Sequence, residues 1–220
     1  MNISYNYAMS YESHMPVLAM LSREESGVFT AAQAVRSGVP RDAISYALRT
    51  GKLERVVRGA YRLSSTAPSE LDLAVALWKL TDPSAYSRER LSSRDGVVVG
   101  GRTAASAWMI GDLHPYPCRI YAPERLRSRV PSVSFAQRRI DPNDTVFSSG
   151  MMVARPERVI LDLALDGEDP SLVADALADA RRRLTGTGEF DTGRLRELFE
   201  SSSGRWGRTP YSLDAIMPEE

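Results

Sequence analysis

Residues 30–63 have the sequence TAAQAVRSGVPRDAISYALRTGKLERVVRGAYRL. Thr30 is a suitable N-cap for a first helix that continues to Ser37, and Pro40 opens a second helix that Gly51 ends. The apolar positions of both segments recur with the spacing of an amphipathic helix. We therefore expect two helices joined by a tight turn.

A β-hairpin is expected after the second of these helices. Two β-type runs within residues 53–63 flank Arg58 and Gly59, a pair that suits a two-residue turn. A further helix is predicted over residues 16–26, so that the order is helix, helix, tight turn, helix, hairpin. This order predicts a winged helix-turn-helix. An ordinary helical hairpin with a β extension is the alternative.

The tight turn carries the residue types that a helix-turn-helix requires. Ala34 is small enough for the point where the two helices cross, and Gly38 tolerates a positive φ four positions later. Val39 and Ile44 are apolar and can hold the second helix in place. Gln33 departs from the pattern, because that neighbourhood is often apolar.

The outward face of the second helix and the wing carry side chains that suit nucleic acid. Arginine can donate two hydrogen bonds to guanine, and serine or tyrosine can bond bases or phosphates. Cations on or beside a wing can contact the backbone or the minor groove. For each residue, a solvated surface charge is the alternative. The predicted DNA-binding residues are Arg41, Ser45, Tyr46, Arg49, Lys52, Arg55, Arg58 and Arg62.

The charge of the whole chain conceals an uneven distribution. Lys and Arg number 28 and Asp and Glu number 28, a zero net charge that by itself argues against a nucleic-acid binder. Residues 16–64, however, contain eight cations and four anions, a net charge of +4. Residues 1–15 contribute −1 and the remainder −3. The basic part is therefore the predicted DNA-binding part.

A second region with mixed helix and strand patterns follows a Ser- and Pro-containing linker at residues 64–69. Its expected helices span residues 70–80, 102–110, 156–165, 171–184 and 192–200, and its expected strands span residues 96–100, 118–122, 132–140 and 145–154. The predicted fold class is α+β, with an N-terminal winged helix-turn-helix domain followed by a mixed α/β C-terminal domain. The expected domains are a flexible arm at 1–15, the winged domain at 16–64 and the mixed domain at 69–220.

The scarce residues argue against most enzyme chemistry. Cys118 is the single cysteine, so neither an internal disulfide nor a multi-cysteine zinc site is expected. His14 and His114 are the only histidines, and neither lies in a catalytic motif. Glycine-rich nucleotide loops and a nucleophile elbow are also missing from the sequence. We predict a protein that is not an enzyme and has no catalytic residue, metal or cofactor. A nuclease or nucleotidyltransferase is a disfavoured alternative.

Membrane and secretion signals are not expected either. The sequence contains no apolar run of the roughly 20 residues that a bilayer-spanning helix needs. The apolar stretch at residues 15–21 is short, and no Lys or Arg precedes it. We therefore expect a cytoplasmic protein.

Several segments resemble the AbiEi-type antitoxins of type IV toxin–antitoxin systems. GVFTAA at 27–32, RSGVP at 36–40 and LRTGKLERVVRGAYRL at 48–63 are similar to the N-terminal domain of that family. GGRTAASA at 100–107 and GMMVARPERVILDLA at 150–164 resemble, more loosely, a helix and a strand-then-helix segment of its second half.

The resemblance implies two functions and two partners. The winged domain would bind double-stranded promoter DNA and repress the protein's own operon. The C-terminal domain would counteract a nucleotidyltransferase-type toxin. A homodimer on inverted repeats and a monomer on each repeat both stay open. The competing hypothesis is a protein-interaction module whose winged domain binds no DNA.

Overall fold

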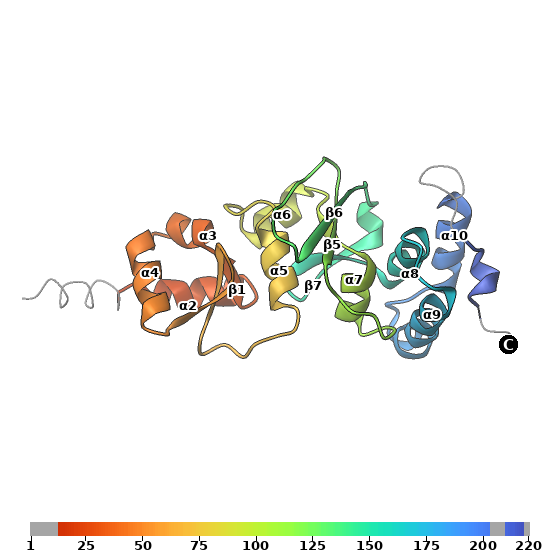
Figure 1. Cartoon of the computed structure of the whole chain (residues 1–220), viewed down its shortest axis with the longest axis horizontal. Coiled ribbons are helices and arrows are strands. Elements are labelled where there is room, and N and C mark those ends of the chain that lie inside the picture. Colours follow the sequence, from red (N-terminus) through yellow and green to blue (C-terminus); the bar gives the residue numbers. More distant parts are fainter. Residues whose placement is uncertain (1–12, 203–209, 218–220) are drawn as a thin grey trace, which may run out of the picture. The chain divides into compact units, whose positions relative to one another are not determined.

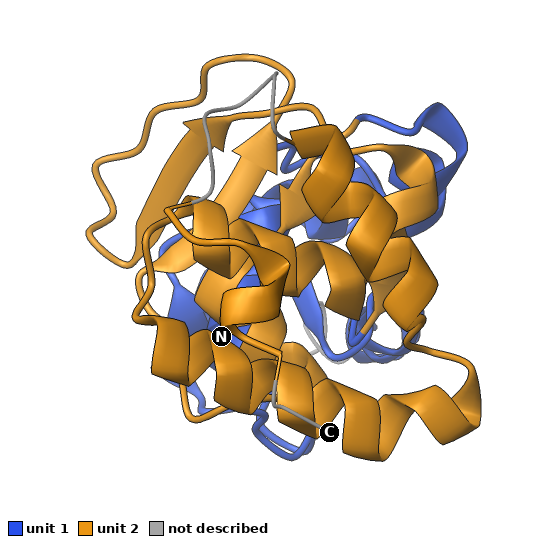
Figure 2. Ribbon diagram, turned by 90° about the vertical axis from the view of Figure 1, so that its right-hand side faces the viewer, with its two compact units in different colours: residues 1–95, 149–151 blue, residues 96–148, 152–220 orange. Residues whose placement is uncertain are grey.

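The computed structural model describes residues 13–202 and 210–217, and the chain divides into two compact units (Figures 1 and 2). Unit 1 comprises residues 1–95 and 149–151, and unit 2 comprises residues 96–148 and 152–220. The division therefore follows Asp95 and not the linker at 64–69. Most of the arm expected at 1–15 lies outside the described residues, and Met15 already begins the first described helix. The independence of residues 16–64 as a domain stays a prediction.

Unit 1 begins with the expected winged helix-turn-helix (Figure 1). Its elements are α2 (Met15–Glu24), β1 (Val28–Thr30), α3 (Ala31–Arg36), α4 (Arg41–Arg49), β2 (Leu53–Val57) and β3 (Ala60–Leu63). The three strands form an antiparallel sheet in the order β1-β3-β2. β1 was not expected, because three residues are too few to show an alternating pattern.

Local capping fixes the helix-turn-helix. The backbone N–H of Gln33 donates to Thr30 Oγ1 at 3.0 Å, and the Thr30 N–H donates to Gln33 Oε1 at 2.9 Å, which completes a capping box. Gly38 occupies the turn with a φ of 90°, and Val39 behind it is fully buried. Ala34 and Ile44 are buried as predicted. A polar residue at position 33, where an apolar one is common, is thus explained, since the Gln33 side chain is part of the cap.

Two further helices complete unit 1. The first, α5 (Asp72–Lys79), was expected, and six of its eight residues are buried. The second, α6 (Ser87–Ser93), was not, because its sequence SRERLSS has no apolar stripe. At the N-terminus of α6, the Glu89 carboxylate accepts a hydrogen bond from the Tyr86 N–H at 2.9 Å.

Unit 2 is a mixed sheet with helices. The five strands have the order β6-β5-β4-β8-β7, in which β4–β8 and β5–β6 are parallel and β4–β5 is antiparallel. The elements are β4 (Val98–Val99), α7 (Gly101–Trp108), β5 (Cys118–Ala122), β6 (Val133–Gln137), β7 (Thr145–Ser148), β8 (Met151–Ala154), α8 (Pro156–Leu165), α9 (Pro170–Leu184) and α10 (Thr192–Ser202). Single 3₁₀ turns occupy Pro142–Asp144, Thr185–Thr187 and Leu213–Ala215. The α+β fold class is confirmed.

One expected strand is wrong. The single strand predicted over residues 145–154 is a hairpin, β7 and β8, joined at Ser149 and Gly150. Both joining residues have positive φ, 53° and 86°, as the tight turn of a hairpin requires. Among the described residues, no helix is long and apolar enough to cross a membrane.

We expect Gly38→Ala to lower the free energy of unfolding by about 1–2 kcal/mol, because alanine is strained in the left-handed region. Crowding is not the cause, since a Cβ at Gly38 would meet no atom within 4 Å. Urea unfolding measures the loss. Gly186→Ala is the matched control, because Gly186 also has open space but no left-handed φ. Equal losses in the two variants would contradict the prediction.

Candidate nucleic-acid interface

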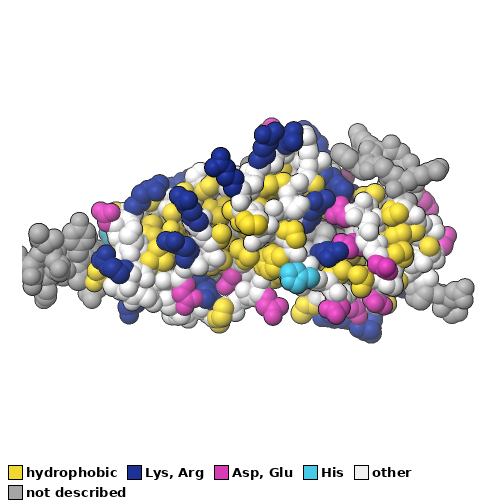
Figure 3. All heavy atoms as spheres, viewed as in Figure 1, with side chains coloured by type: hydrophobic (Ala, Val, Ile, Leu, Met, Phe, Trp, Pro, Cys, Tyr) yellow, Lys and Arg dark blue, Asp and Glu magenta, His cyan; other side chains and the backbone are white. Residues whose placement is uncertain are grey.

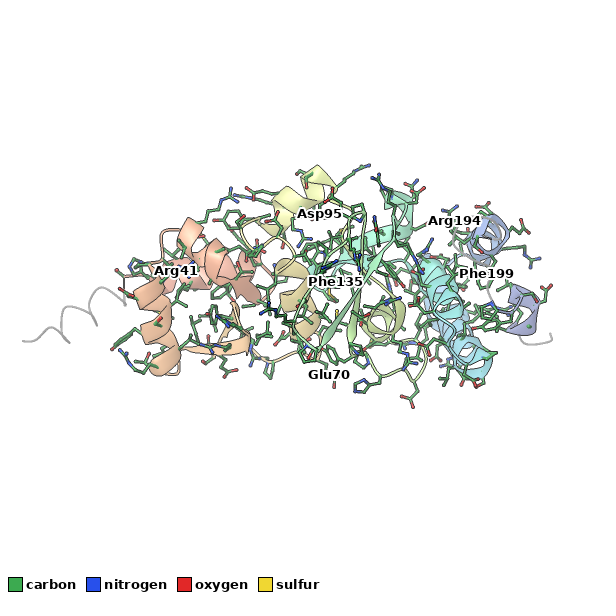
Figure 4. All side chains as sticks on the ribbon, turned by 45° about the horizontal axis from the view of Figure 1, so that its top comes forward. Arg41, Glu70, Asp95, Phe135, Arg194 and Phe199 are labelled. Atoms are coloured by element: carbon green, nitrogen blue, oxygen red, sulfur yellow. The ribbon has the colours of Figure 1, made fainter. Side chains whose placement is uncertain are left out.

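The second helix of the helix-turn-helix presents the predicted polar face to solvent. Ala43, Ile44 and Ala47 of α4 are buried, so the opposite face of this helix is turned toward solvent. That face carries exposed Arg41, Ser45 and Arg49, with half-buried Tyr46 between them. Arg41, which Figure 4 labels, lies at the first position of α4.

Arg49 and Tyr46 form a pair on this face. The Arg49 guanidinium carbon lies 5.3 Å from the centroid of the Tyr46 ring, within the range of a cation–π interaction. Stacking of this kind restricts the rotamers of a long side chain while its N–H groups remain available. The two residues can therefore approach a base edge as one unit.

The wing carries three further exposed cations. Lys52 precedes β2, Arg55 lies within it, and Arg58 occupies the turn to β3. Within residues 13–202 and 210–217, no side chain forms an ion pair with any of them or with Arg41. Figure 3 shows Lys and Arg side chains on the visible face of unit 1.

The structure corrects the expectation for Arg62. Its side chain is only 10% exposed, pairs with Glu54 and lies 3.5 Å from an oxygen of Asp72. Arg62 lies on the central strand β3, directly opposite Glu54 in the register of the hairpin. Opposite charges at such positions stabilise a strand pair, but the burial of Arg62 also depends on Asp72, which lies outside the hairpin. We therefore exclude Arg62 from the interface.

Another cation of the basic segment also has a structural partner. Arg36 of α3 binds Glu89 of α6 through two hydrogen bonds, of 2.6 and 2.7 Å. Its Nη1 also donates to the Ser84 carbonyl at 3.0 Å, and its guanidinium stacks on the Tyr86 ring at 4.6 Å. Arg36 thus fixes α3 in place, and its charge, although exposed, is compensated by Glu89.

Buried polar side chains connect α3 to α2, α5 and α6. Glu25, which is 2% exposed, accepts a hydrogen bond from Gln33 Nε2 at 3.1 Å and pairs with Lys79. Ser87 donates to the same carboxylate at 2.7 Å and receives a bond from Lys79 Nζ at 2.8 Å. Burial lowers the pKa of Lys79, and the charge of Glu25 opposes that effect. This cluster could not be predicted from the sequence, because its members are far apart along the chain.

The structure describes the surroundings of Cys118 and His114. Cys118 is fully buried, and burial raises the pKa of its thiol to about 12, which suits a structural role. His114 is exposed, and its Nδ1 lies 3.0 Å from the Tyr116 carbonyl oxygen. Among the described residues, no group of three His, Cys, Asp or Glu side chains could hold a metal.

We expect the Glu89 carboxyl to remain ionised at pH values well below those at which a glutamate ordinarily titrates. Its hydrogen bonds from Arg36, and secondly from the Tyr86 N–H, lower the pKa of the Glu89 carboxyl to about 2. Because this pKa is depressed by folding, the stabilisation is complete above pH 4.5 and is lost as pH falls toward 2. A carbon-detected NMR titration measures this pKa directly. In Arg36→Gln, the pKa should return toward 4.5, and an unchanged value would contradict the assignment.

Comparison with known proteins agrees with this geometry. Residues 16–64 match the family model described as "Transcriptional regulator, AbiEi antitoxin". No curated protein matches the chain. The chain is similar in fold to the crystal structure of the RV2827C protein from Mycobacterium tuberculosis, with a TM-score of 0.53 and 20% identity over 94% of this chain and 77% of that one. The resemblance of residues 16–64 to the AbiEi-type antitoxin transcriptional regulators is thus confirmed by the family model.

Proposed function

We propose that this protein is an antitoxin that represses its own operon by binding promoter DNA through α4 and the wing. The observation that supports this proposal is the contrast between cations in one short segment. Arg36 and Arg62 are paired with carboxylates, whereas the cations of α4 and the wing are exposed and form no ion pair among the described residues. The proposed contact residues are Arg41, Ser45, Tyr46, Arg49, Lys52, Arg55 and Arg58.

The two parts of this surface would make different contacts. A recognition helix lies in the major groove, where Arg49 can donate two hydrogen bonds to guanine O6 and N7. Arg58 extends from the tip of a hairpin and is suited to phosphates or the minor groove. The helix would therefore supply sequence preference, and the wing would supply affinity that depends on salt.

The second half of the proposal concerns the toxin. In type IV systems of the resembling family, the antitoxin opposes a nucleotidyltransferase-type toxin. We propose that unit 2 has this role here, in the cytoplasm and without catalysis of its own. A homodimer on a repeated operator fits the usual symmetry of helix-turn-helix proteins.

We expect Arg49→Ala to weaken binding to the promoter and to relax its sequence preference. The loss should be about 1–3 kcal/mol if the contact is bidentate, and it should shrink on scrambled DNA. Fluorescence anisotropy on both duplexes, at one fixed salt concentration, measures the difference. Arg23→Ala is the matched control, because Arg23 is an exposed cation of α2 outside the proposed surface. If both variants bind like the wild type, α4 is not the recognition helix.

Arg58→Ala should lower affinity for all sequences equally. Removing one phosphate contact should reduce the slope of log affinity against log salt by about 1. Gel-shift titrations at several salt concentrations give this slope. A slope equal to that of the wild type would remove the wing from the interface.

The competing hypothesis is a winged domain that binds protein instead of DNA. Co-expression with the product of the neighbouring gene separates the two functions. A stable complex together with no salt-dependent DNA binding would favour the interaction module over the repressor.

A further inference from the structure

A cavity of about 590 Å³ lies within unit 2, lined by residues of α8, α10 and the segment around the 3₁₀ turn Pro142–Asp144. Its size is within the range of sites that bind small molecules. Three of its lining residues are arginines, and none of them belongs to the proposed DNA-binding surface. Some of their N–H donors are not used in contacts that hold the fold together.

Arg158 is the buried arginine of this cavity. Its side chain is 8% exposed, and its Nε and Nη2 donate to Asp162 Oδ1 at 3.1 and 2.8 Å. Asp162 is fully buried and thereby holds the guanidinium in one orientation. The third nitrogen, Nη1, makes no hydrogen bond to any residue in the described ranges. A donor held in this way is preorganised for an anion.

Arg139 and Arg194 differ in what they can still bind. Arg194, labelled in Figure 4, donates to Asp144 at 2.6 Å and to Glu197 at 3.2 Å, so its donors are largely used. Arg139 is exposed and has no ion pair among residues 13–202 and 210–217. Arg139 and Arg158 therefore supply two guanidinium groups for one anionic group.

Two carboxylates also line the cavity: Asp144 is paired with Arg194, and Asp141 Oδ1 accepts a hydrogen bond from the Asn143 N–H at 2.9 Å. The other lining residues are apolar or carry hydroxyl groups. Ile140, Leu161 and Leu198 are all less than 9% exposed and form an apolar wall. Ser201 and Ser202 add hydroxyls. We propose that this cavity binds a small phosphate monoester with an apolar body, of the size of a nucleoside monophosphate. The guanidinium groups would bind the phosphate, and the wall would pack against the body.

Isothermal titration calorimetry on the full chain tests this site, with adenosine monophosphate as the probe. We expect one site and weaker binding of adenosine, ribose 5-phosphate and inorganic phosphate, each of which lacks one part. Arg139→Ala should weaken binding about tenfold or more, because a charge-assisted contact is lost. Arg125→Ala is the matched control, since Arg125 is also an exposed arginine of unit 2 but does not line the cavity.

A second variant tests the cavity without removing a charge. Ser201→Trp places a bulky side chain at an exposed lining position and should block binding while leaving the melting temperature unchanged. No heat of binding at millimolar probe would overturn the proposal. Binding of adenosine or inorganic phosphate as tight as that of the monophosphate, or an unaffected Arg139→Ala, would overturn it as well. None of these readouts involves promoter DNA, so the result is independent of the proposed repressor function.

Discussion

The buried carboxylate of Glu25 is the constraint on which unit 1 depends. Removing a carboxylate from water costs several kcal/mol, and this cost is offset only when hydrogen bonds and an opposite charge surround the group. Here Gln33, Lys79 and Ser87 provide these partners from three different helices. Loss of Lys79 would leave this charge buried without an opposite charge, and loss of Gln33 or Ser87 would remove a hydrogen bond from it. The cluster therefore holds α3, α5 and α6 against the C-terminal end of α2.

This constraint reaches α4 through α3. A helix of six residues is too short to be stable alone, so tertiary contacts must fix it. Gln33 and Arg36 attach it to the segment from Pro83 to Glu89. The direction of α4 then follows from the turn at Gly38. Residues beyond the matched segment 16–64 therefore set the geometry of the surface that we propose binds DNA.

The parts of the fold that sequence could predict are those governed by neighbours along the chain. The caps at Thr30 and Gly51 and the wing turn needed only local rules, and the structure has them. α6 escaped detection because its contacts, such as Glu89 with Arg36, join residues 53 positions apart. For the same reason, exposure could be predicted for the face of α4 but not for Arg62, whose burial depends on a neighbouring strand and on Asp72.

The zero net charge of the chain can be interpreted once the ion-pair partners of its arginines are known. An arginine that is held by a carboxylate, such as Arg36 or Arg62, contributes to architecture, and its charge is largely cancelled at short range. Only an exposed cation without such a partner can release counterions from a phosphate backbone. The relevant quantity is thus the number of uncompensated cations on one surface. On α4 and the wing these cations lie close together, so a chain with no net charge can still present a basic surface to DNA.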